Sequence, residues 1–268
     1  MEDLKPASFF NLENSNAAGL FDGLDYVWDA LDRIKDYINR TMRPNVAEVR
    51  QQGEVLTRNV VLYNGEILTQ GFTLIPGDAT KGKFQVRYKN QVLENAAVIY
   101  QGAALMDDDI EIGPGVVVEP GALIKGPTII GARTEVRQGA YIRGVCLTGT
   151  ACVVGHTTEA KNTVMLDDAK AGHFAYLGDS ILGKDVNLGA GTKLANLKIV
   201  NRPIKIKMGD QTIEVDRRKF GAILGDGVQT GCNSVTSPGT VMAPGCLVVP
   251  NMTVAPGYYA SRSVVRPR

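Results

Sequence analysis

The 268-residue chain is poor in features that mark several protein classes. It has two histidines, one tryptophan and no run of about 18 apolar residues that would span a membrane. Its amino terminus, MEDLKPASFF, lacks a charged segment followed by an apolar one, so no secretory signal is expected. These absences favour a cytoplasmic protein with no membrane partner.

Charge of neither sign is in excess. The chain has 29 Lys and Arg against 28 Asp and Glu, a net charge of +1, so no overall field attracts nucleic acid. Four cysteines lie among apolar residues without CxxC spacing, which is typical of buried thiols in a reducing compartment. They are Cys146, Cys152, Cys232 and Cys246. We therefore expect no zinc site, and any anion recognition must be local.

The first third of the chain differs from the rest. Residues 17–40 carry apolar side chains at three- and four-residue steps, which predicts an amphipathic helix around Trp28. Short β-branched runs with NG and PGD turns follow Pro44 and predict hairpins. We expect residues 1–100 to form a region of one helix and short strands, with the helix capping the end of the next domain or recruiting a partner.

From about residue 110 the aliphatic residues recur every six positions. The first unbroken series is Ile112, Val118, Ile124, Ile130, Val136, Ile142, Thr148 and Val154. Gly or Pro follows most of them closely, so each unit is a short strand and a tight turn. This hexapeptide repeat predicts a mainly β chain whose residues 101–268 form a parallel β-helix with 18-residue coils.

Two irregularities interrupt this register. Across DDAKAGHF the pattern slips and resumes at Leu182, which predicts four inserted residues and a bulge that carries His173. After Leu194 it breaks again and resumes at Leu224, and residues 198–218 contain two strand-like runs around MGDQ. We expect residues 198–218 to form a hairpin-like inserted loop.

Stacking of coils brings residues 18 apart close together. Lys125, Arg143 and Lys161 are spaced by 18 and 18, so they should form a ladder of cations about one strand spacing, ~4.8 Å, apart. A solvated basic ridge is one interpretation. The other is a phosphate site, because a phosphate that spans Arg143 and Lys161 gains charge-assisted hydrogen bonds.

The two histidines have different expected roles, and their small number excludes one class of enzyme. His173 is a candidate general base with Tyr176 and Asn187 near it, although a structural or merely exposed histidine fits the pattern as well. His156 follows a glycine in an ordinary turn and is expected at the surface. A β-helix carbonic anhydrase needs three histidine ligands, so two histidines exclude it.

Other catalytic motifs are missing. No GxSxG occurs, and Cys232 either lines a cleft or packs in the interior. The first hundred residues contain no phosphate-binding GxxxxGK[ST] or GxGxxG loop. A nucleotide-binding Rossmann domain is therefore not expected.

The segment YIRGVCLTGTACVVGHTTEAKNTVMLDDAKAGHFAYLGDSILGKDVNLGAGT closely resembles the acetyltransferase domain of the bacterial bifunctional N-acetylglucosamine-1-phosphate uridyltransferases, and the resemblance resumes at KFGAILGDGV. It implies a left-handed β-helix, a homotrimer and acetyl-CoA as co-substrate. It also implies that His173 is the general base and that the amino-sugar phosphate is held by four residues. These are Arg143, Lys161, Tyr176 and Asn187.

The same resemblance implies a coenzyme A cleft between subunits. Ala190 and Lys219 match cofactor-binding residues of the family, and Asn196 is retained although KLANLK replaces TCNYDG. Cys232 stands where the family has serine, and the loop before Lys219 is longer. The uridyltransferase domain has no counterpart, so uridylyl transfer is not expected.

Three functions follow from the sequence. The first is acetyl-CoA-dependent N-acetylation of an amino-sugar phosphate such as glucosamine 1-phosphate, a step in the biosynthesis of UDP-N-acetylglucosamine. The second is a non-catalytic trimeric module that binds a sugar phosphate or sugar nucleotide. The third is the same acetyl transfer to a nucleotide-linked amino sugar.

Overall fold

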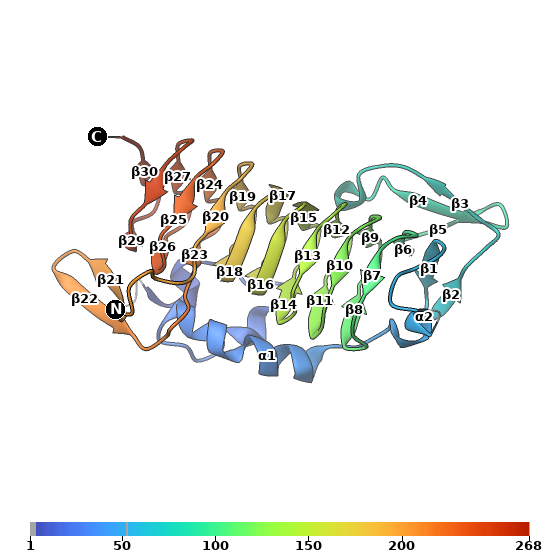
Figure 1. The fold of residues 1–268 in the computed structure, drawn as a ribbon, viewed down its shortest axis with the longest axis horizontal. Helices are drawn as coiled ribbons and strands as arrows, with labels where there is room; N and C mark the ends of the chain where they lie inside the picture. Colours follow the sequence, from blue (N-terminus) through green and yellow to red (C-terminus); the bar gives the residue numbers. More distant parts are fainter. Residues whose placement is uncertain (1–3, 52, 268) are drawn as a thin grey trace.

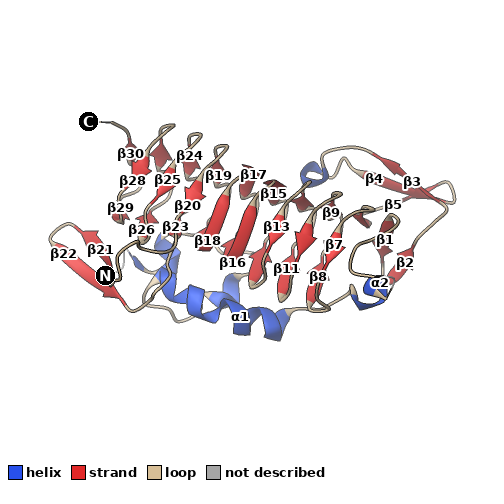
Figure 2. Ribbon diagram, in the orientation of Figure 1, coloured by secondary structure: helices blue, strands red, loops and turns tan. Residues whose placement is uncertain are grey.

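Stacked short strands build a left-handed parallel β-helix with three faces (Figure 1). The computed structural model describes residues 4–51 and 53–267. A helical segment lies along one side of the solenoid, and red strands dominate the secondary structure (Figure 2). None of the described helices is long and apolar enough to cross a membrane. The fold is therefore mainly β, as the hexapeptide repeat predicts.

The strands fall into three parallel stacks. The first face consists of β7 (Ala104–Leu105), β10 (Leu123–Ile124), β13 (Tyr141–Ile142), the start of β16 (Glu159–Met165) and of β18 (Tyr176–Leu182), β20 (Lys193–Leu194), β25 (Val235–Thr236) and β28 (Thr253–Val254). The second face consists of β8 (Ile110–Ile112), β11 (Thr128–Ile130), β14 (Cys146–Thr148), the ends of β16 and β18, β23 (Ala222–Leu224), β26 (Thr240–Met242) and β29 (Gly257–Tyr259). The third face consists of β6 (Ala97–Ile99), β9 (Val117–Val118), β12 (Glu135–Val136), β15 (Val153–His156), β17 (Lys170–His173), β19 (Asn187–Leu188), β24 (Gln229–Thr230), β27 (Leu247–Val248) and β30 (Val264–Val265).

The predicted inward residues are buried. All eight residues of the first hexad series are at most 3% exposed, and the later series from Leu182 and from Leu224 is buried as well. These side chains form one continuous apolar core inside the solenoid. The six-residue period therefore identifies the core correctly on both sides of the irregular region.

The predicted four-residue insertion at DDAKAGHF is wrong. Thr148 pairs with Met165 and Met165 with Leu182, so two consecutive coils are each one residue shorter than a regular coil. The regular corner that precedes them, between β13 and β14, uses two residues of positive φ, Gly144 and Val145, whereas each short corner uses one, Asn162 or Asp179. Asn and Asp tolerate this left-handed conformation. Each short coil thus lacks one corner residue, and β16 and β18 run unbroken across two faces.

The amino-terminal helix is shorter than predicted and lies elsewhere. Residues 17–40 form two turns of 3₁₀-helix, Ala18–Leu20 and Val27–Asp29, and then α1 (Ala30–Thr41), because Gly23 has a φ of +67° and interrupts the helix. The predicted apolar residues are all buried, but α1 packs along the second face and not over the end of the solenoid. A row of outward aliphatic residues on that face receives it. They are Ile129, Leu147, Val164, Ile181, Ile223 and Val241.

The end of the solenoid is covered by other parts of the amino-terminal region. The short helix α2 (Ala47–Arg50) and the segment from Leu56 to Val60 bury Val46, Val49 and Leu56 in the solenoid core. The hairpin of β1 (Val60–Tyr63) and β2 (Glu66–Leu68) pairs antiparallel with β6. A second sheet, β3 (Phe72–Ile75), β4 (Gln85–Tyr88) and β5 (Gln91–Leu93), packs next to it.

The inserted loop contains the expected hairpin. β21 (Ile204–Met208) and β22 (Gln211–Val215) pair antiparallel around Gly209. The hairpin stands at the side of the solenoid next to β29 (Figure 1). Ile204, Ile206 and Val215 are buried in the apolar cluster that also holds α1. The insertion is thus anchored to the amino-terminal segment.

Candidate active site

Three cations form a ladder on the first face. Pairing of β10 with β13 and of β13 with β16 aligns Lys125, Arg143 and Lys161, as their spacing predicts. Neighbouring strands lie ~4.8 Å apart. Lys161 in turn pairs with Gly178, which has no side chain. The ladder therefore ends at a residue without a side chain, and the Tyr176 hydroxyl and the Asn196 amide occupy the space there.

A carboxylate and an aromatic ring accompany the ladder. Arg143 Nη1 lies 2.6 Å from Glu159 Oε1, and this hydrogen bond raises the pKa of Arg143 above its ordinary value. The Tyr141 ring has Lys125 Nζ at 5.9 Å and Arg143 Cζ at 5.8 Å from its centroid. Glu159 is the carboxylate that pairs with the ladder, and among the described residues neither Lys125 nor Lys161 forms an ion pair, so two cations stay available to an anionic ligand.

A chain of hydrogen bonds holds Tyr176 next to the end of the ladder. The Tyr176 hydroxyl donates to Asn196 Oδ1 at 3.4 Å, and Asn196 Nδ2 donates to Asp179 Oδ2 at 2.5 Å. Asn162 Nδ2 donates to the other Asp179 oxygen at 2.9 Å. Burial, followed by the charges of Glu159 and Asp179, raises the pKa of Tyr176. Its hydroxyl therefore remains a proton donor at neutral pH.

His173 stands at a regular corner and not on a bulge. It ends β17, which pairs in register with β15 and β19, and its side chain is exposed. Backbone hydrogen bonds of this corner place Ala190 and Cys232 at the equivalent position of the next two coils. Tyr176 follows three residues later, around the corner. His173 is thus flanked by Tyr176 on one side and by Ala190 on the other.

The remaining predicted residues divide into two groups. Lys219 is exposed and directly precedes Phe220, whose N–H donates to the Asn196 carbonyl at 2.9 Å. Asn187 pairs with Lys170, three residues before His173, so it lies about 10 Å away along the strand direction on the third face. Within one chain Lys219 therefore lies near the hydrogen-bonded residues Tyr176 and Asn196, whereas Asn187 lies apart from them.

Asn196 was expected with the cofactor residues, and the structure places it against Tyr176 and Asp179. The sequence did not single out Tyr141, Glu159, Gly178 or Asp179. A signal for Tyr141 and Glu159 was present, because they occupy the same outward position as Tyr176 in three consecutive coils. The single missing corner residue concealed that row.

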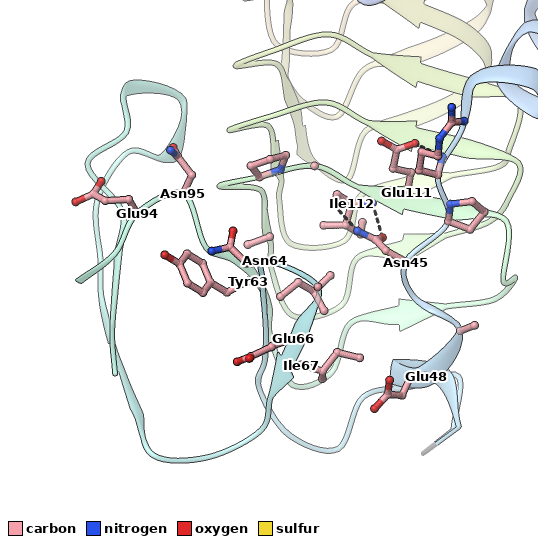
Figure 3. Close-up of a pocket in the computed structure, with 18 residues that line it drawn as sticks. Asn45, Glu48, Tyr63, Asn64, Glu66, Ile67, Glu94, Asn95, Glu111 and Ile112 are labelled. Atoms are coloured by element: carbon pink, nitrogen blue, oxygen red, sulfur yellow. Dashed lines mark hydrogen bonds between the residues drawn. The ribbon is translucent and has the colours of Figure 1, made fainter. Parts of the chain in front are cut away.

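A separate cavity of about 780 Å³ lies near the amino-terminal end (Figure 3). The α2 segment, the β1–β2 hairpin and the first coils line it, with Glu48, Glu66, Glu94 and Glu111 among the lining side chains. Asn45 is one of its walls, and its side chain donates to the Ile112 carbonyl and accepts from the Ile112 N–H. None of the predicted functional residues lines this cavity.

Comparison with known proteins places the solenoid in a family. A family model described as the GMPPB C-terminal domain matches residues 124–264. The chain belongs to this family. The range matched by the GMPPB C-terminal domain includes every predicted site residue, from Arg143 to Cys232. The covering helix α1 and the end cap lie outside it.

Curated relatives extend the comparison. The chain is 35% identical over 148 residues to a bifunctional sugar-1-phosphate nucleotidylyltransferase/acetyltransferase of Sulfurisphaera tokodaii, which covers 53% of this chain and 37% of the relative. It is 29% identical over 240 residues to the bifunctional protein GlmU of Stutzerimonas stutzeri, which covers 83% of this chain and 53% of the relative. The chain thus spans between about a third and a half of these relatives' length.

Proposed function

We propose that this member of the GMPPB C-terminal domain family is an acetyltransferase that uses acetyl-CoA to N-acetylate an amino-sugar phosphate, glucosamine 1-phosphate or a close relative. The observation that carries the proposal is the cation ladder of Arg143 and Lys161, which ends beside Tyr176 and around the corner from His173. The name of the Sulfurisphaera tokodaii relative, a bifunctional sugar-1-phosphate nucleotidylyltransferase/acetyltransferase, supports the same chemistry.

Arg143 and Lys161 would bind the phosphate. The guanidinium offers a planar pair of donors and the ammonium a point charge, and both form stronger hydrogen bonds with an anion than with neutral groups. Glu159 competes for Arg143 at 2.6 Å in the structure. Glu159 occupies Nη1, so a bound phosphate would accept hydrogen bonds from the other N–H groups of the Arg143 guanidinium. The pair supplies orientation, since it fixes the sugar with its amine toward the corner.

His173 would accept the proton of the amine. The nitrogen attacks the thioester carbonyl carbon, a C–N bond forms, the C–S bond breaks and coenzyme A leaves as its thiol after protonation. The ring of His173 is exposed at the corner, so it can reach an amine held by Tyr176. No acyl-enzyme is required, because the substrate amine is itself the nucleophile.

The corner beside His173 suits a thioester. Ala190 presents only a methyl group there, and Cys232 follows in the next coil. Bound acetyl-CoA would supply an activated acetyl group. The backbone N–H near Ala190 is the proposed donor to the oxyanion that develops on the carbonyl. Lys219, exposed next to Phe220, would bind an anionic part of the cofactor.

A second copy of the chain would complete the site. Asn187 belongs to the substrate set by resemblance, yet it lies on the third face of the same chain and apart from Tyr176. In a trimer the third face of one subunit can lie against the first face of the next, which returns Asn187 to the site. The four free thiols fit a reducing, cytoplasmic location.

The direct test is release of coenzyme A thiol from acetyl-CoA, measured with a panel of amino-sugar phosphates and nucleotide-linked amino sugars. We expect turnover with glucosamine 1-phosphate and loss of at least ~100-fold in kcat for His173→Ala, the range of general-base catalysis. Undiminished turnover by His173→Ala would contradict the mechanism. If acetyl-CoA neither reacts nor raises the melting temperature with concentration, the chain is a binding module instead.

Subunit complementation tests the shared site. His173→Ala and Asn187→Ala chains are co-expressed in equal amounts, and activity is compared with each variant alone. If adjacent subunits build each site, random assembly restores about a quarter of the sites to wild type. If both residues act within one chain, no site in the mixture is intact and no activity returns.

A further inference from the structure

The two histidines of the chain occupy equivalent positions in consecutive coils. His156 ends β15, His173 ends β17, and their Cα atoms are register partners in the third-face sheet. The alignment arises because the coil between them is one residue shorter than a regular coil. Parallel neighbours lie ~4.8 Å apart, so both imidazoles leave the same corner side by side.

The strands approach each other closely just before the histidines. A Cβ atom placed on Gly155 would lie 1.9 Å from the Gly172 carbonyl oxygen, so no side chain fits between the strands there. The two histidine side chains are both exposed. The glycines thus bring the backbones together while the rings extend into solvent with nothing from Gly155 or Gly172 between them.

The ring of His156 is oriented in the manner of a metal ligand. Its Nδ1 lies 3.1 Å from the Gln138 carbonyl oxygen of the preceding coil. In the tautomer whose Nδ1 donates to that oxygen, the Nε2 lone pair is free. Metal-binding histidines commonly donate their other ring N–H to a carbonyl or carboxylate in this way. Among the residues that the structure describes, the His173 ring has no hydrogen-bond partner, so either of its nitrogens is available.

We propose that His156 and His173 form a two-histidine chelate for a borderline divalent cation such as Zn²⁺, and that the bound cation removes His173 from proton transfer. Neutral imidazole suits Zn²⁺, Ni²⁺ and Cu²⁺ and not Mg²⁺. The described residues contain no group of three or more His, Cys, Asp or Glu that could hold a metal. The site is therefore an open one, completed by water, and it differs from the structural and catalytic zinc sites that the sequence argues against.

Cation binding stands by itself, whereas the loss of activity rests on the proposed acetyl transfer. The full chain, without a histidine tag, is titrated calorimetrically with Zn²⁺ near neutral pH. We expect about one Zn²⁺ per chain and at least a tenfold weaker affinity in His156→Gln and in His173→Gln, because even the loss of a ligand's outer-shell partner typically costs about 10- to 100-fold in metal affinity. Cys232→Ser, which changes the one exposed thiol on this corner, is the matched control and should bind Zn²⁺ as the wild type does.

The spectroscopic arm uses the small number of histidines. With two imidazoles in the chain, long-range ¹H–¹⁵N spectra assign both rings from the two single variants, and Zn²⁺ should shift the ring nitrogens of both together. Wild-type affinity in His156→Gln, or shifts confined to one ring, would overturn the proposal.

The kinetic arm separates the two proposals. Acetyl transfer by the wild type should fall as Zn²⁺ is added and return with EDTA. The half-inhibiting Zn²⁺ concentration, with each protein normalised to its own metal-free rate, should be at least tenfold higher for His156→Gln than for the wild type. If both histidines bind Zn²⁺ but the rate does not fall, the chelate stands and His173 is not the base. If Zn²⁺ inhibits His156→Gln and the wild type equally, the inhibition half of the proposal fails.

Discussion

Gly178 lies directly opposite Lys161 on the neighbouring strand, so the cation ladder ends at a residue without a side chain. The space above it is taken by the Tyr176 hydroxyl, from the same strand, and by the Asn196 amide. A Cβ atom on Gly178 would lie 2.6 Å from Asn196 Nδ2 and 2.7 Å from the Tyr176 hydroxyl oxygen. The absence of a side chain at this one position therefore lets Tyr176 stand beside Lys161.

Gly178→Ala should displace Tyr176 and Asn196 and weaken substrate binding. We expect KM for the amino-sugar phosphate to rise about tenfold, since one hydrogen bond to a positioned substrate is worth ~1 kcal/mol or more. Gly172→Ala is the matched control, because a Cβ there meets no atom within 4 Å. Steady-state kinetics of both variants give the comparison, and equal KM values would show that the Tyr176 position does not matter for binding.

Loss of the positive charge of Arg143 or Lys161 should weaken binding of the substrate's phosphate group. Arg143→Gln and Lys161→Ala should each lower kcat/KM for the phosphorylated substrate by about 10- to 100-fold, because hydrogen bonds to charged groups contribute ~1.5–3 kcal/mol. The same variants should change little with glucosamine, which lacks the phosphate. Lys125→Ala, one coil further from Gly178, serves as the control. A loss of equal size on both substrates would place these cations outside the phosphate site.

One of the four cysteine thiols should react in the native chain, and the other three should not. Cys146, Cys152 and Cys246 are buried and Cys232 is exposed. Burial raises the pKa of Cys146 and of Cys152 to about 12, so neither forms thiolate near pH 8. Reaction of the native chain with a disulfide reagent should therefore release about one equivalent of chromophore, and the unfolded chain four. Cys232→Ser should abolish the native signal, and more than one fast thiol would contradict the buried positions.

The segment on the second face should contribute strongly to stability. Trp28 is 2% exposed, its ring stacks on Tyr26 at 4.8 Å and it lies 6.2 Å from the Phe220 ring. Trp28→Ala should lower the free energy of unfolding by about 3–5 kcal/mol, as large-to-small changes in cores do. Lys35→Ala on the exposed side of α1 should change it by less than ~0.5 kcal/mol. Chemical denaturation measures both, and a small effect of Trp28→Ala would mean that the turn before α1 is not firmly packed on the solenoid.

The aliphatic hexads made the core predictable, and small residues concealed the irregular coils. Ala160 and Ala171 point inward as the pattern requires, yet alanine does not stand out in a hydrophobic series. The visible series therefore runs from Val154 directly to Leu182, an interval of 28 residues that the pattern predicts as four full hexads with four inserted residues. It is instead five hexad steps, two of which are each short by one residue. This difference decides whether His156 and His173 align.

The position of α1 could not be predicted from its own pattern, because an amphipathic helix shows that one side is buried and not which surface buries it. The complementary signal lay in the solenoid, where Ile129, Leu147 and Val164 each directly precede an inward residue and face outward. The alignment of the three cations was predictable, since the pairing of their strands keeps the 18-residue spacing. The contact between Asn196 and Tyr176 was not, because it depends on the short corner at Asp179.

The length of α1 on the second face matches a fixed number of coils. Its 12 residues extend ~18 Å, close to four strand spacings of ~4.8 Å, and it contacts β14, β16 and β18 in sequence. Repeat proteins usually gain or lose units freely. Here one added or deleted coil beneath α1 would shift the outward aliphatic residues on one side of it against their partners on the helix, so the number of coils beneath α1 is fixed from outside the repeat.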